Sequence, residues 1–156
     1  MRVFRALVTA GVAVLLSVQS QAQMGGRGMM HGAGTMGGSM ARHQLAMHGG
    51  LPGEYAAKKN PLKASADNVS AGEAVYRQNC AVCHGPKGAG DGEGAKALNP
   101  LPGDLRGLSR MPIASDGFYY WVIAEGGAPV KSAMPSYKAV LKEEDVWRLV
   151  QYLRTL

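Results

Sequence analysis

Cys80-Ala81-Val82-Cys83-His84 is the most informative stretch of this 156-residue sequence, and it contains both of its cysteines. The spacing Cys-x-x-Cys-His is the pattern of c-type haem attachment. Two thiols at this spacing can each add to a vinyl group of haem, and the next side chain is then brought beneath the iron as an imidazole ligand. The motif therefore predicts one covalent haem c, attached through Cys80 and Cys83, with His84 as an axial ligand of the iron.

Two other interpretations of these cysteines are weaker. A redox dithiol is expected beside a strand–helix–strand pattern, which is not visible around Cys80. A zinc site usually has four ligands, including a second Cys/His pair. Haem is favoured because His84 follows the second cysteine directly and because an export signal precedes the motif.

The export signal is predicted over residues 1–22. Arg2 and Arg5 form a charged start, residues 6–18 an apolar middle, and Ser20-Gln21-Ala22 a small-residue cleavage site. The apolar run is shorter than the roughly 20 residues that a membrane-spanning helix needs, and no later run is long enough. We therefore expect cleavage near Ala22 and Gln23, a periplasmic location, and no membrane span in the mature protein.

The overall composition excludes several classes of protein. Apolar residues make up 46% of the chain and charged residues 18%, which argues against a wholly disordered protein, whereas the 22 glycines indicate that part of it does not pack. Two cysteines can form at most one bridge, so a disulfide-stapled scaffold is excluded. The net charge of +6 is modest and suits an acidic protein partner better than nucleic acid.

Residues 23–68 are predicted to be a flexible arm and linker. The segment is rich in Gly, Met and His, and at most a short, marginal helix is expected over residues 41–47. A sharper hypothesis is copper binding, because thioethers select Cu(I) and imidazoles accept copper. The residues concerned are Met24, Met29, Met30, His31, Met36, Met40, His43, Met47 and His48.

The second axial ligand of the iron decides between an electron carrier and a ligand-binding haem. The other histidines of the sequence all lie in the predicted arm, so methionine is the expected ligand, and two methionines follow His84. Met111 and Met134 both precede a proline, but only Met134 follows the predicted second helix. We predict Met134 as the ligand and interpret Met111 as a core residue that fills a gap.

Three helices are predicted in the second half of the chain, and no alternating strand pattern competes with them. Ser70-Ala71-Gly72-Glu73 has the order of a capping box and predicts a helix that ends near Asn79. Ser115 is expected to cap a second helix, which ends at Gly126-Gly127. The last helix, over residues 143–154, has acidic residues in its first turn and one apolar face. The fold class is therefore all-α.

Loops between these helices offer further contacts to a haem. A carbonyl of Pro100 or Pro102 is expected to accept the Nδ1 proton of His84, as partners of metal-bound histidines do. Arg106 is a candidate for contact with the haem propionates.

Taken in order, five elements between residues 69 and 156 resemble the class I cytochromes c. They are Cys80 to Gly85, the loop ending in Gly90-Asp91-Gly92, the segment Pro102 to Leu105, Ala133-Met134-Pro135 and the final helix. The resemblance implies a small cytochrome c fold of three to four helices around one haem, with His84 and Met134 as axial ligands. In that family the first and last helices cross through small, aliphatic and aromatic residues, and the matching positions here are Gly72, Tyr76, Leu149 and Tyr152.

The expected function is that of a periplasmic one-electron carrier, which moves electrons between redox proteins of a respiratory or related chain. Imidazole and thioether together fill both axial positions, so no position is left for a substrate, and the thioether raises the potential. We therefore do not expect an enzyme, although the chain can be a subunit or partner of an oxidoreductase. An acidic docking face on the partner would meet four lysines around the haem, namely Lys87, Lys131, Lys138 and Lys142.

Two alternative functions remain open. A haem enzyme or gas sensor results if Met134 is not bound or leaves easily, because the sixth position of the iron is then open or labile. A copper-handling protein results if the Met/His arm captures copper and the haem changes its oxidation state.

Overall fold

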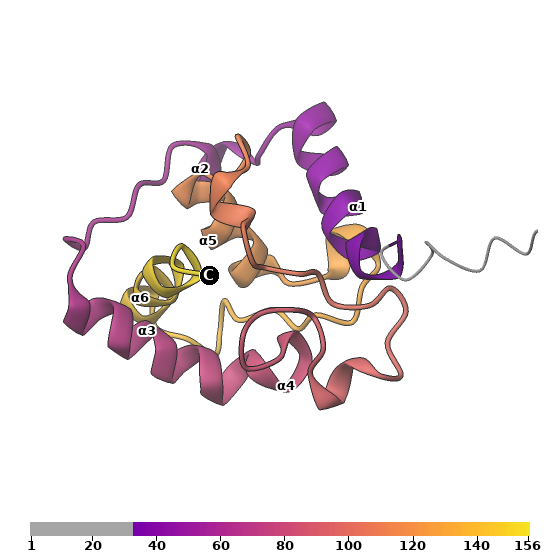
Figure 1. The fold of residues 1–156 in the computed structure, drawn as a ribbon. Coiled ribbons are helices and arrows are strands. Elements are labelled where there is room, and N and C mark those ends of the chain that lie inside the picture. Colours follow the sequence, from indigo (N-terminus) through magenta and orange to yellow (C-terminus); the bar gives the residue numbers. More distant parts are fainter. Residues whose placement is uncertain (1–32) are drawn as a thin grey trace, which may run out of the picture.

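The computed structural model describes residues 33–156, and the predicted signal peptide and residues 23–32 of the arm lie outside this range (Figure 1). Within it the chain forms six α-helices, three short 3-10 helices and no strand, so the prediction of an all-α fold is confirmed. The α-helices are α1 (Ala33–Gly49), α2 (Gly53–Ala56), α3 (Ala66–Asn79), α4 (Ala81–His84), α5 (Asp116–Glu125) and α6 (Glu143–Leu153). The 3-10 helices are η1 (Glu93–Ala95), η2 (Leu108–Arg110) and η3 (Ala128–Val130). None of the helices in residues 33–156 combines the length and apolar character needed to cross a bilayer.

Helices α3 and α6 cross each other and form the most extensive contact between helices in the described residues (Figure 1). Gly72 of α3 lies directly against the backbone of Arg148 and Leu149 in α6, where no side chain would fit. One turn further along, the rings of Tyr76 and Tyr152 lie 5.2 Å apart in the main core cluster. These are the contacts that the family resemblance implies for the first and last helices.

Helix α3 begins earlier than the sequence predicts. Ser65, and not Ser70, is the N-cap, and its hydroxyl accepts a hydrogen bond of 3.1 Å from the backbone N–H of Asn68. Ser70 lies inside the helix, and Glu73 pairs with Arg77 at 2.6 Å instead of closing a capping box. The sequence contains two capping signals in succession, and the helix extends to the earlier one, so the predicted start was wrong.

The other two predicted helices agree with the structure. The hydroxyl of Ser115 accepts a hydrogen bond of 3.1 Å from the N–H of Phe118 at the start of α5. Gly126 ends the helix with a φ of 63°, a conformation that favours glycine. Helix α6 runs from Glu143 to Leu153 and buries the predicted apolar face.

Residues 33–65 differ from the predicted flexible arm and linker. Helix α1 is far longer than the expected turn, and it packs Arg42 and Ala46 against the domain. Tyr55 of α2 lies in a second core cluster with Phe118 and Trp121 of α5. A Gly-rich segment is a poor isolated helix, but contacts with the rest of the fold can outweigh that weakness, and local composition does not reveal them.

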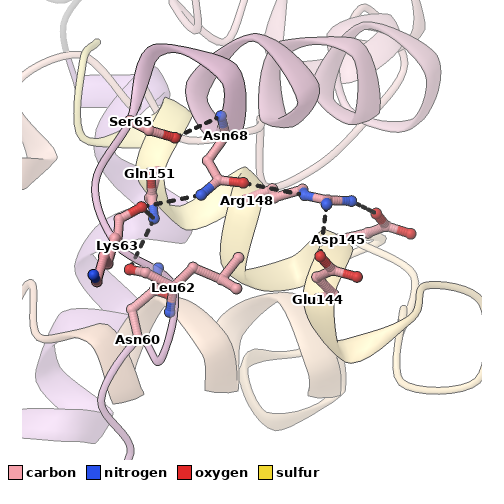
Figure 2. Close-up of polar contacts among 9 residues, drawn as sticks. All are labelled: Asn60, Leu62, Lys63, Ser65, Asn68, Glu144, Asp145, Arg148 and Gln151. Atoms are coloured by element: carbon pink, nitrogen blue, oxygen red, sulfur yellow. Dashed lines mark hydrogen bonds and ion pairs between the residues drawn. The ribbon is translucent and has the colours of Figure 1, made fainter.

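Polar contacts hold the segment before α3 against α6 (Figure 2). The side-chain amide of Gln151 donates to the carbonyls of Leu62 and Lys63, each at 3.2 Å. Asn68 donates to the Lys63 carbonyl at 3.0 Å and accepts from Arg148 at 3.4 Å. Residues 60–65 are therefore a fixed part of the helix pair.

Candidate haem site

A cavity of about 370 Å³ lies between α4, α5, the loop of residues 98–108 and the segment of residues 130–137. Its volume is within the usual range of small-molecule and cofactor sites. Both cysteines of the motif line it, together with His84. The apolar side chains of its wall include Leu98, Leu101, Leu105, Leu108, Ile113, Phe118, Val122 and Val130.

The local structure presents the motif on a single turn. The N–H of Cys80 donates to the carbonyl of Tyr76 at 2.8 Å at the end of α3, and the N–H of His84 donates to the carbonyl of Cys80 at 2.9 Å. The two thiols are not bonded to each other. Burial, reinforced by the nearby Cys83, raises the pKa of the Cys80 thiol to about 12. A reactive dithiol needs a lowered thiol pKa, so the redox interpretation gains no support.

The His84 ring is oriented by one hydrogen bond. Its Nδ1 lies 3.1 Å from the carbonyl oxygen of Gly103, and since a carbonyl only accepts, Nδ1 is the protonated nitrogen and Nε2 keeps its lone pair. Burial lowers the pKa of this imidazole, which favours the neutral form that binds metals. The predicted acceptors, Pro100 and Pro102, were wrong, because the carbonyl within hydrogen-bond distance of Nδ1 belongs to Gly103, the residue after Pro102.

The loop after the motif supports that carbonyl. Gly90 has a φ of 79°, and a side chain there would come within 2.6 Å of the Pro102 carbonyl oxygen. The N–H of Leu105 donates to the carbonyl of Gly88 at 2.7 Å. On the opposite side, the buried hydroxyl of Tyr76 donates to the Gly85 carbonyl at 2.6 Å. Gly85, directly after His84, is thereby joined to α3, and the loop that contains Gly103 is joined to the loop after the motif.

Both candidate methionines line the cavity, so the lining does not distinguish between them. Met134 follows η3, and its carbonyl accepts from the N–H of Gly127 at 2.7 Å. The segment after Met134 is joined to the residue directly before the motif, because the hydroxyl of Tyr137 donates to the Asn79 carbonyl at 2.8 Å. Met111 is 38% exposed and lines the cavity, so it is not fully buried in the protein core.

Helix α1 adds two residues to the cavity wall that the sequence did not place there. Arg42 and His43 both line the cavity, and Nδ1 of His43 is buried without a hydrogen-bond partner. The only sequence signal is the spacing of Arg42 and Ala46, which puts both on one helical face. Met47 and His48 of the copper hypothesis are exposed, and Met24, Met29, Met30 and His31 lie outside the described residues.

Two of the predicted surface cations already have partners. Arg106 forms two hydrogen bonds with Asp104, at 2.9 Å and 2.5 Å, and these contacts hold the pKa of that carboxyl below its usual value. Lys138 pairs with Glu125 at 3.0 Å. Groups of three or more His, Cys, Asp or Glu that could hold a metal ion are absent from the described part of the chain.

Comparisons with known proteins gave a matching family and a similar solved structure. The sequence profile of the family described as cytochrome C oxidase, cbb3-type, subunit III matches residues 67–153. A chain of the reducing HAO-like protein complex of Kuenenia stuttgartiensis is similar in structure, with a TM-score of 0.50 and 25% sequence identity. That match covers 61% of this chain and 46% of the other, so this chain spans less than half of its structural neighbour. A search of curated proteins gave no match.

Proposed function

Since this chain belongs to the family of cytochrome c oxidase, cbb3-type, subunit III, and is a class I c-type cytochrome, we propose that it carries single electrons between redox proteins in the periplasm. In this proposal Cys80 and Cys83 would hold one haem c covalently, and His84 and Met134 would bind its iron. The observation that carries the proposal is the convergence of these four side chains on one mostly apolar cavity.

The residues of the cavity fit this group. When bound, haem supplies an iron that alternates between the ferrous and ferric states. The Gly103 carbonyl holds the Nδ1 proton of His84, which orients the ring and makes Nε2 a stronger donor. The thioether of Met134 is a soft ligand that favours ferrous iron and raises the potential. The apolar wall of the cavity limits the access of water, and low solvent access strengthens the effect of the ligands on the potential.

The export signal predicted over residues 1–22 supports a periplasmic location. The structural neighbour is part of a reducing HAO-like protein complex, and this supports redox proteins as partners. Docking is proposed around Val82, which lies between the two cysteines and is 58% exposed. An acidic face on the partner would meet exposed lysines that take part in no ion pair among the described residues, namely Lys87, Lys131 and Lys142.

The test is the visible spectrum of the reduced, haem-loaded protein before and after addition of carbon monoxide. We expect an unchanged low-spin spectrum in the wild type and a rapid shift in Met134→Ala. Met111→Ala and His43→Ala are matched controls, because both side chains line the same cavity, and they should behave as the wild type. A shift in one of the controls instead would assign the ligand to that residue. A rapid shift in the wild type would replace the carrier with a haem enzyme or gas sensor.

A further inference from the structure

Arg42 of α1 is a buried cation at the haem cavity. It lies outside residues 67–153, which the family profile matches, yet it lines the cavity and is only 5% exposed. Its guanidinium group lies 4.7 Å from the centre of the Trp121 ring, and its Nη2 donates to the carbonyl of Gly126. Both contacts hold the side chain in place against α5, but neither supplies a negative charge.

The charge of Arg42 is not balanced by the described residues. Its second terminal nitrogen, Nη1, is buried without a hydrogen-bond partner, and no ion pair in residues 41–156 includes it. Burying an unpaired charge is costly, and buried charges are normally paired or hydrogen-bonded. Burial accordingly lowers the pKa of this guanidinium. Because Arg42 lines the cavity, an anionic group bound in the cavity would supply the missing negative charge.

We propose that Nη1 of Arg42 binds a propionate carboxylate of the haem, so that α1 forms part of the haem site. The proposal rests on the haem c function given above. Haem brings two propionates, and guanidinium–carboxylate pairs are among the strongest hydrogen-bonded contacts. Arg106, the arginine expected from the sequence, also lines the cavity, but the carboxylate of Asp104 binds its Nε and Nη2 and balances its charge. Of the two arginines that line the cavity, Arg42 is the one without a carboxylate partner among the described residues.

A cation held in the cavity also acts on the iron. A fixed positive charge in a site of low dielectric constant favours the reduced, less positive state of the haem. Arg42 therefore raises the midpoint potential and, through the propionate, fixes α1 over the cavity. Arg110 provides a matched control, since it is exposed, does not line the cavity and has the same formal charge.

The experiment compares the full-length, haem-loaded wild type with Arg42→Gln and Arg110→Gln. Haem content is measured first, by the pyridine haemochrome spectrum. The midpoint potential is then followed as a function of pH, and the propionate bending band is recorded by resonance Raman spectroscopy. We expect Arg42→Gln to lower the potential and shift the propionate band, while Arg110→Gln leaves the band unchanged and the potential nearly so, because its charge is screened by water.

The outcomes separate the inference from the function on which it rests. A wild type without covalent haem would remove the proposed function itself. A haem-loaded Arg42→Gln whose potential and band match those of Arg110→Gln would overturn the role of Arg42. A wild-type potential that varies with phosphate at constant ionic strength would also overturn it, because a small anion would then occupy Nη1.

If Arg42→Gln fails to load haem, the proposal is tested with Arg42→Lys instead. Lysine keeps the charge but replaces a planar fork of donors by a point charge. We expect a potential close to that of the wild type with a shifted propionate band. An unchanged band in Arg42→Lys would overturn the proposal.

Discussion

Replacing Gly72 by alanine tests whether the crossing of α3 and α6 holds the fold together. An added Cβ would lie 2.6 Å from the carbonyl carbon of Arg148 and 3.1 Å from the N–H nitrogen of Leu149, whereas ordinary contact begins at 3.4 Å. Both neighbours are backbone atoms and cannot rotate away. The helices must therefore separate by roughly 1 Å, a gap that forfeits about a quarter to a half of the dispersion energy of the facing atoms.

The cost follows from this geometry. Overpacking of this kind typically costs about 1 to 3 kcal/mol, and the lost contacts of buried Tyr76 and Leu149 add to it, so we expect a loss of about 3 kcal/mol in the free energy of unfolding. With a guanidinium chloride m-value of roughly 2 to 6 kcal/mol/M, the midpoint should fall by about 1 M.

The assay is denaturant unfolding of the haem-loaded protein, followed by circular dichroism and by Soret absorbance. Gly53→Ala is the matched control, because a Cβ at Gly53 meets no atom within 4 Å. It should leave the midpoint within about 0.2 M of the wild-type value, since an exposed substitution at a helix end changes stability by only a few tenths of a kcal/mol. Equal midpoints for Gly72→Ala and Gly53→Ala would refute the reasoning.

Three further perturbations test other parts of the molecule. Cys83→Ala leaves one haem vinyl group unreacted, so the α-band of the reduced haem should move to longer wavelength; an unchanged band would mean that Cys83 is not an attachment point. Burial alone would raise the pKa of Asp116, but hydrogen bonds from Asn60 and Arg154 outweigh it and hold that pKa below its usual value. The ionised carboxylate therefore stabilises the fold at any pH above the unfolded pKa of about 4. This stabilisation is lost as the pH falls through the lower pKa of the folded state. Asp116→Asn should therefore lower the free energy of unfolding at pH 7 by about 1 to 2 kcal/mol, with a difference from the wild type that shrinks in acid, and a difference that grows in acid would contradict this. Exposed lysines that lie near the motif or Met134 in sequence should make electron exchange with an acidic redox protein slow down as salt rises, and replacement by glutamine should flatten that dependence. Rates indifferent to salt in the wild type would argue against an acidic partner. The lysines to replace are Lys87, Lys131 and Lys142.

The sequence predicted those parts of the fold whose signals are local. Ser115 and Gly126 delimit α5, and the acidic first turn with its apolar face delimits α6, because caps and periodicity act within a few residues. The start of α3 was missed because Ser65 and Ser70 both resemble caps, and only packing against α6 selects between them. Sequence rules for N-caps recognise both serines as candidates but do not say which of them starts the helix.

The candidate site also contains residues that local sequence predicts and residues that depend on distant packing. The cysteines and His84 are adjacent in sequence, so their meeting at one cavity could be predicted. Arg42 and His43 could not, because their positions depend on α1 packing against a helix more than seventy residues later in the chain. Pro100 or Pro102 was predicted as the acceptor for His84 in place of Gly103, since prolines indicate an extended path but not which carbonyl faces the ring.

The hydrogen bond from Tyr76 to Gly85 has a consequence for the speed of electron transfer. It joins the most deeply buried ring of the helix crossing to the residue directly after His84, and Gly103 fixes the ring from the other side. In the proposed carrier, these two contacts would restrict the movement of the imidazole when the charge on the iron changes. A ligand held in the same place in both oxidation states would keep the inner-sphere reorganisation energy small, and electron exchange would then need only a modest driving force.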